Sequence, residues 1–393
     1  MYTDRQIDRI LNKLKRMEEM LEPELFEKVD ELSEVSSYQT EKVLDRIPET
    51  ALFRKTSRGD TWEGEGTYCW YRSNYVVPQR LCGETLYIYP HIGGYEGLLW
   101  VNGVPHGNFA SKIACNTHGN HYCDHLVSNA GSGQRIEIAL EYYANHYVKG
   151  TMPFQTDPVP DFKYSYNGVD ICRKDREICD FYFDLKIVNQ MVEVLPKESF
   201  RRAELIKALL QVHDIVYYDA EQINKETFRK ALRQAAPFLR TELEKKNAEP
   251  GPFAGIVGHS HMDTAWLWTV EETKKKCART YSNQIAFMEE YPEYRFIQSS
   301  TYHSEIMRDY YPELFEKIQS YVKEGRYEPN GAVFIECDCN IPSGESIIRQ
   351  FLIGQQFLQR EFDYRADTFW LPDTFGYSAA LPQIMLGEVF PYD

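Results

Sequence analysis

Strand-like and helix-like segments alternate through the last third of the 393-residue chain, and this alternation constrains the fold more than any other feature. Short apolar runs predict strands at residues 254–258, 295–300, 327–336 and 367–372. Helical periodicity fills the intervals and predicts helices over Thr264–Tyr291, Tyr302–Glu324 and Gly344–Phe362. Repeated strand–helix units predict a parallel sheet covered by helices. In such sheets, functional side chains gather at the carboxyl ends of the strands.

A different pattern occupies residues 61–183, where short β-rich runs of alternating polarity are broken by Gly, Pro and Asn. This pattern is typical of an antiparallel β-sandwich. Within the segment WVNGVPHG, the pair Asn102–Gly103 stands between β-forming residues. An Asn–Gly pair in that setting predicts a tight hairpin turn.

The remaining segments are mostly helical. Residues 1–50 open with an amphipathic pattern, residues 196–246 have helical periodicity, and residues 247–253 form a Pro/Gly-containing breaker. The predicted domains are a helical segment at 1–60, a β-sandwich at 61–190, a helical linker at 191–250 and an α/β domain at 251–393. The chain is therefore expected to be a multidomain protein that combines α+β and α/β parts.

Composition excludes several classes of function. The net charge is −15 and the basic residues are scattered, which argues against nucleic acid as a partner. No apolar run approaches the length of about 18 residues that a membrane span requires, and the N-terminus lacks the apolar region of a signal peptide. The nine cysteines include no C-x-x-C pair. These features predict a cytoplasmic protein with free thiols.

The segment GIVGHSHMDTAWLW carries the densest chemistry, because His259, His261 and Asp263 follow the first predicted strand of the α/β domain. Asp373 follows the fourth, within WLPDTFGYS. Imidazole and carboxylate ligands together suit zinc or a similar divalent metal. Structural alternatives remain open: Asp263 could cap a helix that begins near Thr264, and Asp373 could be a turn residue after proline.

Several long segments resemble the class II α-mannosidases of glycoside hydrolase family 38, most closely their cytosolic-type branch. The segments are GHSHMDTAWLW, YPEYRFIQSS, YPELFEKIQSYVKEGRYEPNGAVF, NIPSGESIIRQFLIGQQFLQREF and FWLPDTFGYSAALPQIM, in that order. The resemblance extends from about Phe253 to Met385, and the β-rich stretch resembles the N-terminal β-sandwich of the same branch. It implies a zinc-dependent retaining hydrolase of α-mannoside oligosaccharides, with cobalt or another divalent metal as an alternative, on a β/α barrel.

The resemblance also implies roles for individual residues. His261 and Asp263 match metal ligands of the family, and Asp373 matches a residue that is both metal ligand and nucleophile. Trp266 and Phe375 match aromatic side chains that stack on or wall the mannose. A carboxylate nucleophile and a second acid across the bond are the groups that retaining glycoside hydrolysis requires.

Two departures from the family pattern stand out. Cys337 and Cys339 flank Asp338 at positions where proline and a small polar residue are expected; we expect inert buried thiols, and an Asp338 that either faces the site or binds backbone. The family continues beyond Met385 with a fourth metal ligand and a general acid. The resemblance therefore predicts that residues 251–393 form an incomplete, truncated β/α barrel and that this chain is an inactive form.

Three other interpretations were weighed. A metal-dependent amidohydrolase also places His-x-His after its first barrel strand but needs further histidines at later strands, where this chain offers His303. A non-catalytic sugar-binding or regulatory fragment is the second alternative. A separate metal site formed by His118, His121, Cys123 and His125 in the β-rich region lacks regular zinc-ligand spacing.

Overall fold

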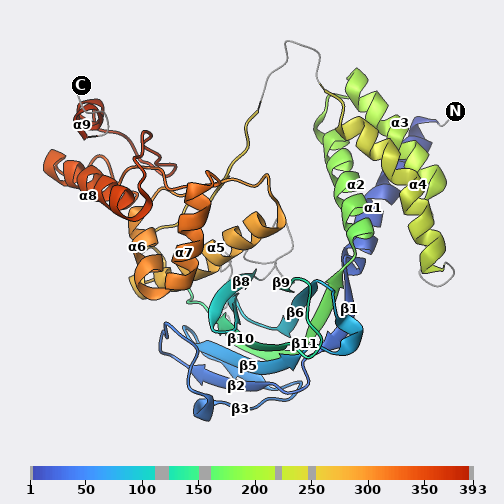
Figure 1. The fold of residues 1–393 in the computed structure, drawn as a ribbon. Helices are drawn as coiled ribbons and strands as arrows, with labels where there is room; N and C mark the ends of the chain where they lie inside the picture. The colour runs from blue at the N-terminus through green and yellow to red at the C-terminus, as the bar shows by residue number, and fades with distance from the viewer. Residues whose placement is uncertain (1–2, 111–123, 150–160, 217–223, 247–253, 389–393) are drawn as a thin grey trace. The chain divides into compact units, whose positions relative to one another are not determined.

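The computed structural model describes residues 3–110, 124–149, 161–216, 224–246 and 254–388 (Figure 1). Contacts divide the chain into two compact units, which are described separately here. The first comprises Met1–Asp30, Thr85–Tyr87 and Ile171–Ala254, and the second comprises Glu31–Glu84, Ile88–Asp170 and Gly255–Asp393. None of the helices in the described ranges combines the length and hydropathy needed to cross a bilayer.

Four helices form the core of the first unit: α1 (Asp4–Leu21), α2 (Arg176–Val194), α3 (Phe200–Ile215) and α4 (Lys225–Leu243). Three of them begin at side-chain caps, since Asp175, Ser199 and Asn224 accept backbone N–H groups of the first turn. Leucines from all four helices, among them Leu14 and Leu239, are fully buried in one cluster. Burial of this shared apolar face holds the bundle together.

Two predictions for this part of the chain were wrong. Helical structure does not extend to residue 50, because the chain after Leu21 forms strands β1 (Phe26–Glu31) and β2 (Ser36–Thr40). The β-rich region also ends early, since α2 begins at Arg176. The α2 sequence is rich in aromatic and β-branched residues, which resemble a strand locally, but the Asp175 cap and packing among the other helices favour the helix. The segment expected as a linker, residues 191–250, supplies α3 and α4 to the same bundle.

The β-rich region forms two sheets. The further strands are β3 (Arg54–Lys55), β4 (Thr61–Glu63), β5 (Tyr68–Val76), β6 (Leu86–Ile92), β7 (Glu96–Val101), β8 (Val104–Ala110), β9 (Asp124–Val127), β10 (Arg135–Tyr143) and β11 (Lys163–Lys174). One sheet has the order β1-β11-β6-β9 with β4 beside β11, and the other has the order β3-β2-β5-β10-β7-β8. The six-stranded sheet is antiparallel at every junction.

The predicted hairpin is confirmed. Val101 pairs with Val104 across a two-residue turn, and Asn102 and Gly103 adopt φ angles of 51° and 86°. Positive φ at both central residues is the conformation that Asn–Gly tolerates and most other residues do not. The turn sets the register of β7 and β8, and β7 in turn pairs with β10.

The α/β region contains a parallel sheet, as predicted, but with three strands rather than the four expected. Its strands β12 (Gly258–His259), β13 (Phe296–Ile297) and β14 (Tyr327–Glu328) lie in sequence order. The helices are α5 (Val270–Glu290), α6 (Thr301–Tyr310), α7 (Pro312–Lys323), α8 (Gly344–Phe362) and α9 (Leu381–Glu388). The prediction for Gly344–Phe362 is confirmed. The helix predicted over Tyr302–Glu324 is interrupted, because Tyr311 leaves the helical conformation immediately before Pro312.

The predicted strand at 367–372 is wrong, since the structure assigns no strand there. Gly331 N–H donates to the carbonyl of Thr368, but a strand requires a ladder of such bonds, and Pro372 lacks a donor. The first predicted strand also begins later than expected, at Gly258, with Ile256 almost fully exposed. The described residues contain no closed barrel.

Within the second unit, α5 packs against the six-stranded sheet through buried charges. The Lys275 side chain is fully buried; its Nζ lies 3.0 Å from a Glu141 carboxylate oxygen and over the rings of Trp70 and Trp100. Nearby, Arg279 pairs with Glu96 at 2.7 Å. Charges removed from water require such close partners, so these pairs fix the position of α5 on the sheet.

Candidate metal centre

A ten-residue loop, 260–269, connects β12 to α5 and carries most of the predicted site. The helix begins at Val270 with Thr269 as its cap, so the alternative role of Asp263 as the helix cap is not observed. The buried Thr273 hydroxyl donates to the carbonyl of Thr264 and accepts the indole N–H of Trp268 at 3.1 Å. These bonds tie the loop to the first turn of α5 and thereby position Asp263 beside the end of β12.

Three predicted ligands converge. One atom each of His261, Asp263 and Asp373 can be chosen so that all lie within 4.8 Å of one another. Nε2 of His261 is 3.8 Å from an oxygen of Asp263 and 3.6 Å from an oxygen of Asp373. Ligands bound tetrahedrally at about 2 Å from zinc would be separated by about 3.3 Å. The observed spacings need only small side-chain movements to meet that geometry.

Glu336, which the sequence analysis did not identify, orients the histidine of this group. Its carboxylate lies 2.6 Å from Nδ1 of His261, and its side chain is only 8% exposed. The Ser299 hydroxyl donates to the other carboxylate oxygen. An ionised carboxylate can only accept, so Nδ1 of His261 carries the proton and Nε2 presents its lone pair to the two aspartates. The position of Glu336 after the apolar run AVFI was the available sequence signal.

The other two histidines of this region stand apart from the group. Nε2 of His259 is 3.4 Å from the Ser299 hydroxyl, and its ring packs edge-on against Trp370. His303 is buried between Thr264 and Gln298, at 3.2 Å and 3.3 Å from their side chains. Burial lowers the pKa of His303 to about 4, with a smaller contribution from His261. His303 is therefore a neutral core residue rather than an additional ligand.

A pocket of about 390 Å³ opens beside the three converging side chains. Its lining residues are His261, Met262, Asp263, Thr264, Ala265, Ile335, Glu336, Cys337, Asp338, Asp373, Thr374 and Phe375. Phe375 is 83% exposed and forms part of the wall, as an aromatic residue that contacts substrate should be. Trp266 is 64% exposed but lies outside the lining, edge-to-face with Trp268. Trp266 is thus accessible rather than a core residue.

Cys337 and Cys339 are buried thiols, and Asp338 binds backbone N–H groups. Burial raises the pKa of Cys337 to about 11, and Cys339 is also buried, with a thiol 3.6 Å from the carbonyl of Cys337. Asp338 accepts the backbone N–H groups of Asn340 at 2.7 Å and Ile341 at 2.9 Å. Those two bonds lower the pKa of Asp338. Burial raises the pKa of both thiols and disfavours the thiolate form that binds a metal.

The second histidine–cysteine cluster falls largely outside the described residues, which include neither His118, His121 nor Cys123. His125 is described: Nδ1 lies 3.3 Å from His106 and Nε2 lies 2.9 Å from the Ser128 hydroxyl.

Residues 254–388 match the profile described as the N-terminal domain of glycosyl hydrolases family 38. This segment, about a third of the chain, is therefore similar to the N-terminal domain of family 38 α-mannosidases.

Two relatives illustrate the extent of the similarity. Alpha-mannosidase G of Dictyostelium discoideum is 32% identical over 334 residues, and alpha-mannosidase 2C1 of Homo sapiens is 31% identical over 340. Both alignments cover 85% of this chain but only 30% and 31% of the relatives, so the chain spans less than a third of their length. Among solved structures, a β-glucuronidase from Ruminococcus gnavus matches 38% of this chain and 29% of its own, with 10% identity and a TM-score of 0.26, and this likeness supports no inference.

Proposed function

We propose that residues 251–393 form part of the β/α-barrel catalytic domain of a metal-dependent retaining α-mannosidase that removes terminal mannose from α-mannoside oligosaccharides. One observation carries the proposal: His261, Asp263 and Asp373 come from two separate loops of the family-matched segment, yet their ligand atoms lie within 4.8 Å of one another. Convergence of ionisable side chains from separate loops beside an open pocket is a recognised feature of functional sites.

The donor set suits a divalent cation. One imidazole nitrogen and two carboxylates are ligands that zinc accepts, and cobalt or another divalent metal is compatible with the same set. Glu336 supplies the hydrogen bond that metal-bound histidines normally make through their other nitrogen. When bound, the cation would hold sugar hydroxyls and help to distort the ring toward the oxocarbenium-like transition state.

We assign Asp373 as the nucleophile. Its side chain is 51% exposed at the edge of the pocket, so a substrate can reach it. Its carboxylate oxygen would form an ester with the anomeric carbon while the glycosidic bond breaks, and water would later cleave that ester. Phe375 forms an aromatic wall beside it, and the exposed Trp266 is proposed to stack on the mannose.

The general acid is not assigned to any residue of this pocket. A retaining enzyme needs a second carboxylic acid about 5 Å across the scissile bond, protonated when the substrate binds. Asp338 is unsuited because its two backbone hydrogen bonds lower its pKa and so favour the ionised form. Glu336 is engaged by His261 and Ser299. Activated substrates, whose leaving groups need little protonation, are therefore the appropriate probes.

Two further observations bear on the proposal. The buried His303 offers no ligand to the group, which disfavours an amidohydrolase. The seven described cysteines, Cys69, Cys82, Cys172, Cys179, Cys277, Cys337 and Cys339, are all free thiols, which supports the proposed location in a reducing, cytoplasmic setting.

The test is to purify the chain, remove bound metal, restore zinc or cobalt, and assay an activated aryl α-mannoside beside its β-anomer. Metal-dependent turnover of the α-anomer alone supports the proposal. Saturable mannoside binding without any turnover would favour the non-catalytic sugar-binding alternative. Zinc affinity measured directly by calorimetry checks the ligand assignment independently, because His261→Ala should weaken it while His259→Ala should change it much less.

A further inference from the structure

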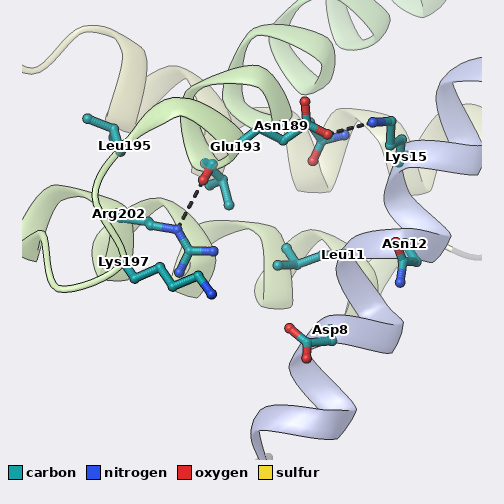
Figure 2. Close-up of a pocket in the computed structure, with 10 residues that line it drawn as sticks. Asp8, Leu11, Asn12, Lys15, Asn189, Glu193, Leu195, Lys197 and Arg202 are labelled. Carbon is teal, nitrogen blue, oxygen red and sulfur yellow. Dashed lines mark hydrogen bonds and ion pairs between the residues drawn. The ribbon is translucent and has the colours of Figure 1, made fainter.

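A second hollow lies in the four-helix unit, and none of its lining residues belongs to the candidate metal centre. Its volume is about 400 Å³, within the range of small-molecule sites. Figure 2 shows that α1 forms one wall, and that the end of α2, the following turn and the first turn of α3 form the other. Neither the family similarity of residues 254–388 nor the proposed hydrolase chemistry involves this hollow.

Arg202 is held in position at this hollow. Its Nε donates to the carbonyl of Val192 at 3.0 Å, at the last turn of α2, and this bond fixes the plane of the guanidinium group. The two terminal nitrogens have no partner among the residues that the structure describes, and they face the hollow in Figure 2. A guanidinium group oriented in this way presents a two-pronged donor that fits a phosphate or carboxylate.

Lys197 brings a second positive charge to the same wall. Lys197 and Arg202 both line the hollow, and Figure 2 labels both side chains on this wall. A third cation, Lys15, is already neutralised by Glu193 at 2.6 Å, and this bond raises the pKa of Lys15. Lys197, like Arg202, has no carboxylate partner within the described ranges. Two cations that line one hollow without carboxylate partners can attract an anion, even though the net charge of the chain is −15.

The opposite wall has different chemistry. Asp8 and Asn12 stand one helical turn apart on α1 and face the hollow, so they can accept and donate hydrogen bonds. Leu11 and Leu195 supply apolar surface between the two walls. The hollow therefore combines cations that can bind an anion, apolar surface, and side chains that can bind hydroxyl groups. This combination fits a small polyhydroxylated molecule that carries one anionic group.

We propose that this hollow binds a phosphorylated monosaccharide, with the phosphate on Arg202 and Lys197 and the sugar hydroxyls on Asp8 and Asn12. The proposal does not depend on the hydrolase activity, since every residue that carries it belongs to the first unit. A bound sugar phosphate would bridge α1 to the α2–α3 turn and would stabilise the bundle by mass action.

The experiment is calorimetric titration of the full chain with mannose 6-phosphate, with mannose and inorganic phosphate as comparison probes. We expect mannose 6-phosphate to bind at least about tenfold more tightly than either comparison probe, and added salt to weaken its binding. Equal affinity for uncharged mannose would overturn the anion assignment. Equal affinity for inorganic phosphate would overturn the sugar assignment, and no binding of any probe would overturn the proposal as a whole.

Variants identify the residues. Arg202→Gln should weaken binding by at least about tenfold, and Arg202→Lys, which keeps the charge without the planar fork, should recover only part of the affinity. Lys207→Gln is the matched control, because it removes the same charge from an exposed position of α3 outside the hollow. Circular dichroism melting separates loss of binding from loss of folding. Equal loss of affinity in the Lys207 and Arg202 variants would contradict the assignment.

Discussion

The carboxylate of Glu336 lies 2.6 Å from Nδ1 of His261 and determines which imidazole nitrogen faces Asp263 and Asp373. Replacement by glutamine removes the charge and leaves an amide that can accept or donate at this position. We expect Glu336→Gln to weaken zinc affinity by about 10- to 100-fold, the usual cost of losing such a supporting partner. Competition with a chromophoric chelator measures the affinity. Glu293→Gln, at an exposed site remote from the pocket, should leave it unchanged.

In a form of the protein that hydrolyses mannosides, Asp373→Asn should abolish catalysis, because an amide cannot form the glycosyl ester. Turnover of an activated aryl α-mannoside should fall by at least about a thousandfold, as expected when a nucleophile is removed. The comparison is Asp367→Asn, an exposed neighbour whose carboxylate accepts a hydrogen bond from Thr368. If the Asp373 variant kept a substantial fraction of kcat, the nucleophile would have to be another residue.

Trp266→Ala should weaken mannoside binding while leaving the stability of the fold nearly unchanged. Trp266 is 64% exposed, so its removal forfeits little buried area and should change the melting temperature only slightly. Loss of a stacking surface should instead raise KM for mannosides. Trp268→Ala is the contrasting variant, because it removes structural contacts. The ammonium group of Lys276 lies over the Trp268 ring, 4.4 Å from its centroid, and the indole N–H donates to the Thr273 hydroxyl. An unchanged KM with Trp266→Ala would exclude the stacking role.

The buried pair of Lys275 and Glu141 gives a prediction about stability. Lys275→Met leaves Glu141 in the core without its cation, and burial already raises the pKa of that carboxyl. Breaking such a pair typically costs about 3–5 kcal/mol. Urea unfolding should show a loss of this size for Lys275→Met and a substantial recovery when Glu141→Leu is added. If adding Glu141→Leu recovers no stability, the loss in Lys275→Met comes mainly from altered packing around Trp70 and Trp100 rather than from the unpaired carboxylate.

His303 makes stability depend on pH. Its pKa in the folded protein is about 4, below the ordinary histidine value of 6.5, because the buried ring resists protonation. The stabilisation from the neutral ring is complete above pH 6.5 and is lost as the pH falls toward 4, with a loss of about 2 kcal/mol by pH 5. His303→Gln should lose less stability than the parent between pH 7.5 and pH 5 in urea titrations. An identical pH dependence would show that His303 does not contribute.

The sequence was most informative where local chemistry decides structure. Asn102–Gly103 predicted its hairpin because few other residues adopt positive φ twice in succession. Ser343 caps the helix Gly344–Phe362, and Asp363 ends it in a left-handed conformation, so both ends were readable. The loop positions of His261 and Asp373 after apolar runs also suggested that they would meet.

The sequence was least informative where contacts between segments far apart in the chain determine the structure. The strand-like residues of α2 become helical within a bundle whose other members lie far away in sequence. Glu336 could not be linked to His261 by spacing alone, because the contact joins loops 75 residues apart. The segment 367–372 has strand propensity but no ladder of backbone partners in the structure. Propensity describes a residue's own preferences and says nothing about what will lie beside it.

The burial of Lys275 and Arg279 against the six-stranded sheet has a practical consequence for dissecting this protein. A fragment that began at Ala254 would contain the whole family-matched segment but neither Glu141 nor Glu96. In that fragment Lys275 would lose its carboxylate partner, Arg279 would keep only Glu272 of its own helix, and the buried face of α5 would be exposed to water. Because Thr273 of the same helix anchors the loop that carries Asp263, the ligand-bearing loop would be disturbed as well. A variant of this protein intended to keep the geometry of the candidate metal centre should therefore retain the six-stranded sheet on the same polypeptide.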